Sequence, residues 1–175
     1  LGGVSPEGGL ERYFPSPGDT GAIPATLLHN VPGGFVPGTQ ALGEMIDGAE
    51  GQLEILNSYL TDPDMLDRIE EAGKRGVDVT VVVPLRSNVS PARDAAQHNY
   101  GRLFDAGVRV YEYETIIHQK VYIADDTLMI GTINLDAWAL YRNNEIAILF
   151  EDPAVADEAR RVLVDDALSR STAAT

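Results

Sequence analysis

The amino-acid sequence predicts an α/β domain in which helices flank both faces of a mixed β-sheet. Strand-like and helix-like segments alternate along most of the chain, which is typical of layered α/β proteins. The segment 77–84 is apolar almost throughout, as expected for a strand that is buried on both faces. The segments 116–124 and 128–132 predict a hairpin of two strands, which makes the sheet mixed rather than purely parallel.

The composition is that of a globular chain. Its 175 residues suit one domain and are enough to bury a core. Hydrophobic residues make up 44% of the chain and the mean hydropathy is -0.10, which argues against a disordered chain. There is no cysteine, so disulfides and cysteine-ligated metal sites are excluded. No apolar run reaches about 18 residues, so we expect no transmembrane segment and a cytoplasmic or peripheral membrane location.

The charge is strongly acidic. The chain carries 27 acidic and 13 basic residues, a formal net charge of -14. Nucleic acid binds to basic surfaces, because its affinity depends on neutralising phosphates. The charge therefore argues against a nucleic-acid partner, although a local basic pocket on an acidic protein stays possible.

The start of the chain differs from the rest. Residues 1–22 are rich in glycine, proline and serine, which predicts a linker or extended arm before a single domain at 23–175. The chain begins at Leu1, without an initiator methionine and without the basic and apolar stretches of a signal peptide. We therefore expect it to be a piece of a longer protein.

The first third of the domain predicts a strand, a loop and a helix. A short strand is expected at 25–29, and the glycines and prolines of 30–38 predict a loop. Thr39 is the expected cap of a helix at 39–49. Its apolar face is formed by Leu42, Met45 and Ile46.

A second strand and helix follow. The alternation in 52–59 predicts a strand with Leu53, Ile55 and Asn57 on one side. Asp62 and Pro63 begin the next helix, because proline is well tolerated in a first turn, and Gly76 ends it. Its expected buried face consists of Met65, Ile69 and Ala72.

The second half of the chain continues the alternation. Pro91 begins a helix that runs to about residue 106 and is closed by Gly107. Strands are expected at 108–113 and 145–150, on either side of the hairpin. The segment 153–170 has apolar residues at helical spacing and predicts an amphipathic helix.

The hairpin carries the residues that predict chemistry. His118 and Lys120 share a face of its first strand, because alternate side chains of a strand point the same way. The returning strand brings Thr132 and Asn134 beside them, and Gly131 leaves room for a ligand to approach the backbone. An imidazole, an ammonium, a carboxamide and a hydroxyl around one spot suit a phosphodiester.

Each group has a role in such a reaction. Lys120 and Asn134 hold the non-bridging oxygens and stabilise the charge of the transition state. We expect His118 to attack phosphorus as a neutral imidazole and to form a covalent intermediate. Taken singly, these residues have ordinary explanations: a structural histidine, a solvated lysine, a turn at Asp125 and a bulge at Gly131. Their order and spacing together make the pattern specific.

This pattern resembles the motif of the phospholipase D superfamily. The motif is His-x-Lys, four residues, Asp, about six residues, and Gly-Ser/Thr-x-Asn. His118, Lys120, Asp125 and Asn134 match it, except that five residues separate Asp125 from Gly131, one fewer than usual. Removing one residue within a strand reverses its faces, so the loss is expected in the turn at 125–127.

The resemblance covers most of residues 23–170. It includes the helix–strand unit around 75–79, the strand at 106–113, and the acidic residues Asp136 and Glu145. The subgroup that the chain resembles most is the bacterial cardiolipin synthases, in their C-terminal half. The resemblance implies a phospholipase D-like fold with one copy of the motif.

The resemblance also implies roles for single residues. His118 matches the nucleophile or its general-acid partner, and Lys120 and Asn134 match phosphate-binding positions. Glu145 matches a carboxylate that orients the imidazole, with an ordinary strand-edge charge as the alternative. Asp125 is expected to support the hairpin and Lys120.

The substrate pocket is implied at the end of the strand 52–59. Tyr59 lies in the matching segment, with plain core packing as the alternative, and Ser58 stands where the family usually has proline. The implied reaction is phosphatidyl transfer between phosphatidylglycerol and a second phospholipid or an alcohol. The resemblance implies no cofactor and no metal.

The resemblance also implies that a complete site needs two motifs that face each other, and this chain has one. His29 and His98 are not followed by lysine two residues later. The partner motif must therefore come from the same longer chain or from a second copy. Two alternatives remain at this point: a single-motif homodimeric phosphodiesterase or endonuclease of the same superfamily, and a non-enzymatic domain with a decayed motif.

Overall fold

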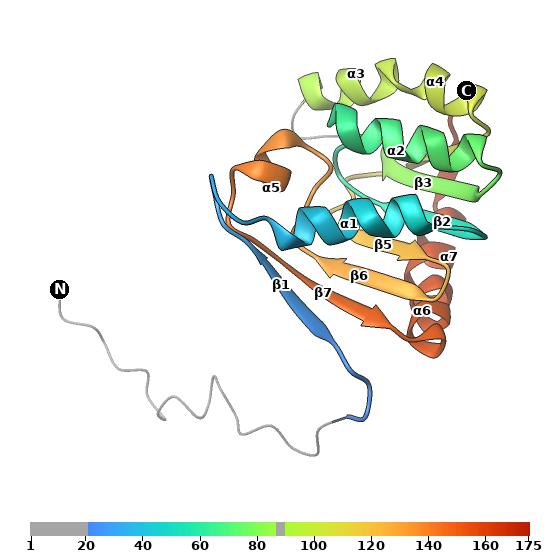
Figure 1. The fold of residues 1–175 in the computed structure, drawn as a ribbon. Helices are drawn as coiled ribbons and strands as arrows, with labels where there is room; N and C mark the ends of the chain where they lie inside the picture. The colour runs from blue at the N-terminus through green and yellow to red at the C-terminus, as the bar shows by residue number, and fades with distance from the viewer. Residues whose placement is uncertain (1–20, 87–89) are drawn as a thin grey trace, which may run out of the picture.

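The computed structural model describes residues 21–86 and 90–175, with side chains of the second range from residue 93. The predicted arm at 1–22 lies outside the described residues except for its last two positions. The described residues form one eight-stranded sheet with helices on both faces (Figure 1). The mixed α/β class predicted from the sequence is therefore confirmed.

The sheet has the strand order β1-β7-β6-β5-β2-β3-β4-β8. The neighbouring strands β2, β3 and β4 are parallel to one another, and the other pairings are antiparallel. The strands are β1 (Thr26–Asn30), β2 (Gln52–Leu56), β3 (Asp78–Pro84), β4 (Arg109–Tyr113), β5 (Val121–Ala124), β6 (Thr127–Gly131), β7 (Glu145–Glu151) and β8 (Ser171–Ala173).

Helices α1 and α2 lie in front of the sheet in Figure 1, and α6 and α7 lie behind it. A π-helical segment, Arg160–Val164, joins α6 to α7, so the predicted C-terminal helix forms in three consecutive parts. The helices are α1 (Pro37–Gly48), α2 (Pro63–Lys74), α3 (Ser90–His98), α4 (Tyr100–Asp105), α5 (Ala137–Tyr141), α6 (Pro153–Ala159) and α7 (Asp165–Ser169).

Strand alternation divides the core into two layers. Leu53 and Ile55 of β2 point toward α1 and α2, whereas Leu56 points toward α6 and α7. Strand β3 is buried on both faces, as its apolar run predicts. On the second face, Arg160 forms an ion pair with Glu54 of β2 at 3.1 Å. Burial raises the pKa of Glu54, and this nearby guanidinium only partly offsets that effect.

The start of α1 corrects the prediction that Thr39 is its cap. The helix begins at Pro37, and the side chain that accepts from its first turn is Asn30 of β1, whose Oδ1 lies 2.8 Å from the Gly38 nitrogen. The Thr39 hydroxyl instead donates to the Leu140 carbonyl at 2.6 Å. Proline needs no hydrogen-bond acceptor at the first position, so the helix starts two residues earlier than expected.

The helix predicted from Pro91 to residue 106 is two helices, α3 and α4, that meet at Asn99. The Asn99 Nδ2 donates to the Ala95 carbonyl at 3.0 Å, and asparagine side chains commonly compete in this way with the helical backbone. The edge strand β8 was not predicted, because its three residues, Ser171–Ala173, have no strand pattern of their own.

The hairpin is shorter than predicted. β5 begins at Val121 and β6 ends at Gly131, so His118, Lys120 and Asn134 lie just outside the two strands. The Gly131 nitrogen still donates to the Lys120 carbonyl at 3.2 Å, which extends the pairing by one residue. The two segments of the motif are therefore held side by side at one end of the sheet.

Candidate active site

The motif lies where the parallel strands β2, β3 and β4 end and where β5 begins. This is the end of the sheet at which α5 lies in Figure 1. Ligand sites of α/β sheets commonly open at the carboxyl ends of the parallel strands. A pocket of about 200 Å³ occurs here, lined by Ser58, Tyr59, Pro84, Ile116, Ile117, His118 and Asn134.

His118 and Asn134 share this pocket, as the motif predicts. His118 is exposed, so its imidazole is accessible from solvent. Asn134 is half-buried, and its Oδ1 is buried without a hydrogen-bond partner among the described residues. A buried acceptor without a partner is uncommon in folded proteins. Tyr59 also lines the pocket, as expected from the strand end.

Lys120 lies behind His118 and is only 5% exposed. Its Nζ donates to the His118 carbonyl at 2.9 Å and to the Ser58 hydroxyl at 3.3 Å. Burial lowers the pKa of Lys120, although the carboxylates of Glu145 and Asp136 act in the opposite direction. The ammonium is therefore fixed against the pocket wall by neutral oxygens rather than by a paired carboxylate.

Ser58 connects the loop after β2 to the segment before β5 by two hydrogen bonds. Its hydroxyl donates to the Ile117 carbonyl at 2.7 Å while it accepts from Lys120. The sequence indicated Ser58 only as a departure from the family's usual proline, and its contact with Lys120 could not be anticipated. The two residues are separated by 62 positions in the chain.

A buried network holds the loops of the site. Asn57 is fully buried, and its Nδ2 donates to the Tyr122 hydroxyl at 2.6 Å. Tyr122 in turn donates to the Ile133 carbonyl at 2.8 Å. The Asn57 Oδ1 accepts from the nitrogens of Tyr59 at 3.0 Å and Leu135 at 3.3 Å. The network therefore fixes Ile133 and Leu135, the two residues on either side of Asn134.

The network was missed in the sequence, although one signal was present. Asn57 continues the buried face of Leu53 and Ile55, and a polar residue on an otherwise apolar face requires hydrogen-bond partners. The partner could not be identified from the sequence, because Tyr122 is 65 positions away.

Glu145 does not make the predicted contact with His118. Within the described residues its carboxylate accepts from the Thr132 hydroxyl and from the Asn143 Nδ2, the latter at 3.1 Å. It is 9% exposed and acts electrostatically on Lys120. The antiparallel pairing of β6 with β7 places Glu145 beside Thr132, so its orienting role within one chain is not supported.

Thr132 and Gly131 both contact β7, and their predicted substrate contacts stay predictions. The Thr132 hydroxyl also accepts from the Ile146 nitrogen at 3.0 Å. A Cβ at Gly131 would collide with the Ile146 carbonyl and would lie 2.6 Å from the Ala147 Cα. The glycine therefore accommodates the backbone of β7, and its approach to a ligand stays a prediction.

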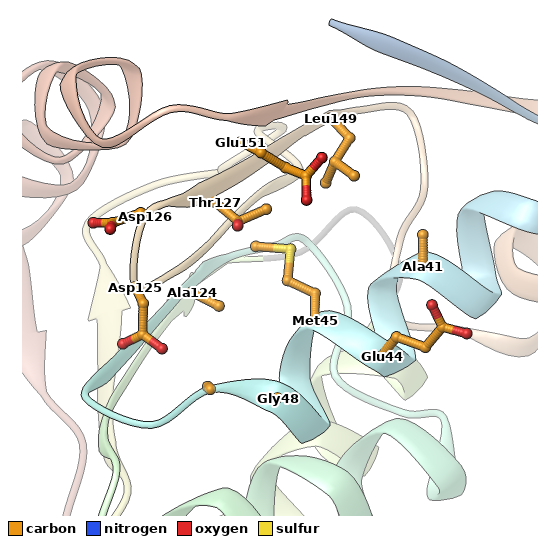
Figure 2. Close-up of a pocket in the computed structure, with 11 residues that line it drawn as sticks. Ala41, Glu44, Met45, Gly48, Ala124, Asp125, Asp126, Thr127, Leu149 and Glu151 are labelled. Atoms are coloured by element: carbon orange, nitrogen blue, oxygen red, sulfur yellow. The ribbon is translucent and has the colours of Figure 1, made fainter.

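Asp125 lies at the other end of β5 and does not support Lys120. Figure 2 shows its side chain directed from the hairpin turn toward the chain that follows Gly48. The carboxylate accepts from the nitrogens of Glu50, Gly51 and Gln52, each at 2.9 Å. Burial raises the pKa of Asp125, but the three N–H groups and Arg160 together outweigh it and lower the pKa.

Asp125 also has a positive φ of 48°, a conformation that aspartate and asparagine tolerate better than most residues. The two-residue turn of Asp125 and Asp126 is consistent with the expected shortening between Asp125 and Gly131. A pocket of about 410 Å³ lies beside this turn, with the acidic residues Glu44, Asp126 and Glu151 among its lining (Figure 2). It is separate from the pocket that His118 and Asn134 share.

The arrangement is suited to binding an anionic ester. His118 offers an accessible nitrogen, Asn134 offers a carboxamide, and Lys120 adds a positive charge immediately behind them. Positioned donors and charges of this kind stabilise developing negative charge on phosphate oxygens. The described residues contain no group of three or more histidine, aspartate or glutamate side chains placed to hold a metal ion.

Comparison with known proteins identifies similar sequences. The family described as "Cardiolipin synthase, PLD-like domain" matches residues 42–166. Cardiolipin synthase A of Yersinia pseudotuberculosis serotype O:1b is 33% identical over 135 residues, which are 75% of this chain and 28% of that protein. Cardiolipin synthase A of Erwinia tasmaniensis is 34% identical over the same shares. The chain therefore spans less than a third of the length of these relatives.

Solved structures share the fold. Nuc from Salmonella typhimurium, described as a phospholipase D family member, has a TM-score of 0.73 at 24% identity, and the match covers 86% of this chain and 99% of Nuc. NucT from Helicobacter pylori has a TM-score of 0.65 at 19% identity, covering 86% of this chain and 100% of NucT. Phosphatidylserine synthase of Haemophilus influenzae has a TM-score of 0.66 at 14% identity, covering 86% of this chain and 40% of that protein.

Proposed function

The chain belongs to the family of phospholipase D-like domains that includes cardiolipin synthase, and we propose that it transfers phosphatidyl groups through a covalent phosphohistidine at His118. The observation that carries the proposal is the pocket that the accessible His118 shares with Asn134, whose carboxamide N–H groups can donate to phosphate oxygens, with Lys120 directly behind. These three groups combine a nucleophile with a positive charge and a carboxamide for phosphate oxygens.

The proposed reaction has two steps. A neutral nitrogen of His118 attacks phosphorus, a nitrogen–phosphorus bond forms, and the bond to the leaving alcohol oxygen breaks. The leaving oxygen takes a proton from an acid on a second motif. An acceptor hydroxyl then attacks the phosphohistidine, gives its proton to the same group, and releases His118. Water as the acceptor gives hydrolysis, and an alcohol or a lipid hydroxyl gives transfer.

The choice of a phospholipid rests on sequence similarity and charge. The relatives that are a third identical to this chain are cardiolipin synthases. The net charge of -14 is unfavourable for binding a polyanionic nucleic acid. No helix of the described residues is long and apolar enough to cross a bilayer.

The partner in the reaction is a second phospholipase D-like domain. This chain carries one His-x-Lys pair, and it spans only 28% of the cardiolipin synthases that it matches, so their remaining length is one source of a second motif. The other source is a second copy of the chain. The match covers 99% of the Nuc chain in its solved structure, which supports a homodimeric phosphodiesterase as the second candidate.

The experiment compares the protein with its His118→Ala variant on defined phospholipids. Products are analysed by mass spectrometry, and the oligomeric state is measured in parallel by light scattering. We expect the variant to lose product formation and to lose the acid-labile phosphate that can be trapped on the unaltered protein. His98→Ala is the matched control, because His98 is also exposed but lies in the last turn of α3.

Three results would contradict parts of the proposal. Unchanged products from His118→Ala would exclude His118 as the nucleophile. Efficient turnover by a verified monomer would exclude the need for a second motif. Salt-sensitive cleavage of DNA, with no action on phospholipids, would favour the homodimeric phosphodiesterase with a nucleic-acid substrate.

A further inference from the structure

Several exposed hydrophobic side chains lie at the same end of the sheet as the pocket. Ile116, which is 56% exposed, lines the pocket itself. Leu85 follows β3 at the same end of the sheet, and Trp138 is on α5, a few residues after Asn134. We call this set of residues the rim: Val31, Phe35, Leu85, Ile116, Trp138 and Tyr141.

Hydrogen bonds hold two segments of the rim in place, the turn between β1 and α1 and the helix α5. The turn between β1 and α1 is closed by bonds from the Val31 nitrogen to the Phe35 carbonyl at 3.0 Å and from Gly34 to Val31 at 3.2 Å. The Thr39 hydroxyl donates to the Leu140 carbonyl at 2.6 Å, which ties the start of α1 to α5. Figure 1 shows this turn and α5 beside each other at the same end of the sheet. The apolar residues are therefore displayed on ordered segments.

The rim contains three aromatic residues, whereas the other exposed large apolar residues that the structure describes include none. Phe35, Trp138 and Tyr141 are 69%, 65% and 37% exposed. The large hydrophobic residues exposed elsewhere are all aliphatic: Ile23, Leu27, Ile130, Ile146, Ile148 and Val162. Tryptophan and tyrosine are enriched at the boundary between lipid headgroups and hydrocarbon, where one part of the ring is apolar and another is polar.

Arg142 adds a positive charge to the rim. Its guanidinium carbon lies 5.4 Å from the centroid of the Trp138 ring, within the range of a cation–π interaction. A guanidinium in this position suits the phosphate of a lipid headgroup, with which it forms paired hydrogen bonds. The rim thus combines apolar rings with a phosphate-binding charge next to a pocket that contains His118.

We propose that the rim docks on the surface of a lipid bilayer and places the pocket at the level of the headgroup phosphates. This proposal rests on the proposed function, because a phospholipid substrate has to be reached in the bilayer. The net charge of -14 opposes attraction to an anionic surface, so the contact depends on insertion of the apolar rings. A zwitterionic bilayer of phosphatidylcholine is therefore the appropriate probe.

Trp138 reports directly on this contact, because it is the single tryptophan of the chain. Its fluorescence is recorded while phosphatidylcholine vesicles are added to the full chain. We expect a shift of the emission to shorter wavelength and quenching by brominated acyl chains. Emission that is unchanged at saturating vesicle concentration overturns the proposal. A shift that depends on protein concentration without vesicles also overturns it, because a second copy of the chain would then cover the rim.

Vesicle co-sedimentation of two matched variants locates the surface. Phe35 and Leu27 are both 69% exposed, but Phe35 belongs to the rim and Leu27 to the aliphatic set. Phe35→Ala should lower the vesicle–water partition coefficient about tenfold. Burial of one large apolar side chain changes an equilibrium constant by about that factor or more. Leu27→Ala should leave the coefficient unchanged. An equal loss in both variants would assign the contact to another face.

A soluble substrate separates this proposal from the proposed function. Hydrolysis of a water-soluble phosphodiester is measured for the unaltered protein and for His118→Ala without vesicles. If His118→Ala loses activity and the unaltered protein does not bind vesicles, the proposed chemistry is retained and the docking surface is rejected. Vesicle binding with no action on any phosphodiester would retain the surface and reject the chemistry.

Discussion

Replacement of Asn57 by alanine tests whether one buried carboxamide holds the loops of the active site together. The Asn57 side chain has two short contacts: its Nδ2 donates to the Tyr122 hydroxyl at 2.6 Å, and its Oδ1 accepts from the Tyr59 nitrogen at 3.0 Å. It is fully buried, so water cannot replace either contact without entering the core. Two longer contacts, to Ile133 and Leu135, add to these.

The magnitude follows from the buried groups that lose a partner. Each buried polar group left without a hydrogen bond costs roughly 1–3 kcal/mol, so loss of the two short contacts predicts a decrease of about 2–6 kcal/mol in the free energy of unfolding. Domains of this kind commonly have a free energy of unfolding of about 5–15 kcal/mol, so Asn57→Ala should still fold at room temperature. Because Asn134 lies between Ile133 and Leu135, phosphodiester turnover should also fall.

Urea denaturation followed by circular dichroism measures the change in the free energy of unfolding. Tyr122→Phe removes only one hydroxyl of the network and should cost about 1 kcal/mol. Asn99→Ala is the matched asparagine control, because within the described part of the chain its only side-chain bond is to the Ala95 carbonyl at the junction of α3 and α4. An Asn57→Ala variant within about 0.5 kcal/mol of Asn99→Ala would refute the reasoning.

Three further predictions concern residues of the motif. Gly131→Ala should lower the free energy of unfolding by at least about 3 kcal/mol in urea denaturation, because its Cβ collides with β7. Gly101→Ala in α4, where nothing lies within 4 Å, should raise it by up to about 1 kcal/mol, and equal effects would contradict the packing argument. Asp125→Asn keeps a residue that tolerates positive φ but loses the charge, and should cost about 1–3 kcal/mol at neutral pH. Because the folded protein lowers the pKa of Asp125 below 3.8, this difference should be present above pH 3.8 and disappear as the pH falls through the lower, folded value. A difference that persists in strong acid would show that the carboxylate charge is not its source. Lys120→Met should abolish phosphodiester turnover yet leave the thermal midpoint equal or higher, because burial disfavours the ammonium. A large drop in that midpoint would show that Lys120 is needed mainly for folding.

Local sequence patterns predicted most of the elements. The alternation in 52–59, the apolar run of 77–84 and the Asp62–Pro63 helix start all correspond to observed elements. These signals are local, since they depend on periodicity and on the conformational preferences of single residues. The predictions failed where a residue distant in the sequence determines the bounds of an element. Asn30 moves the start of α1, and the pairing with β4 orders β8.

The sequence by itself determined the chemical groups of the site and their order. His118, Lys120 and Asn134 follow the spacing of a phosphodiester motif, and β5 and β6 bring them to one end of the sheet. The hairpin is a local structure, so neighbours in the sequence become neighbours in space.

Only the tertiary structure decided which neighbours these residues meet. Lys120 is fixed by Ser58, 62 positions away, and Asp125 binds the backbone before β2, up to 75 positions away. Glu145 faces Thr132 because β7 pairs with β6 in one register. Strand order and register depend on how the whole core packs, and that packing cannot be inferred from the motif alone.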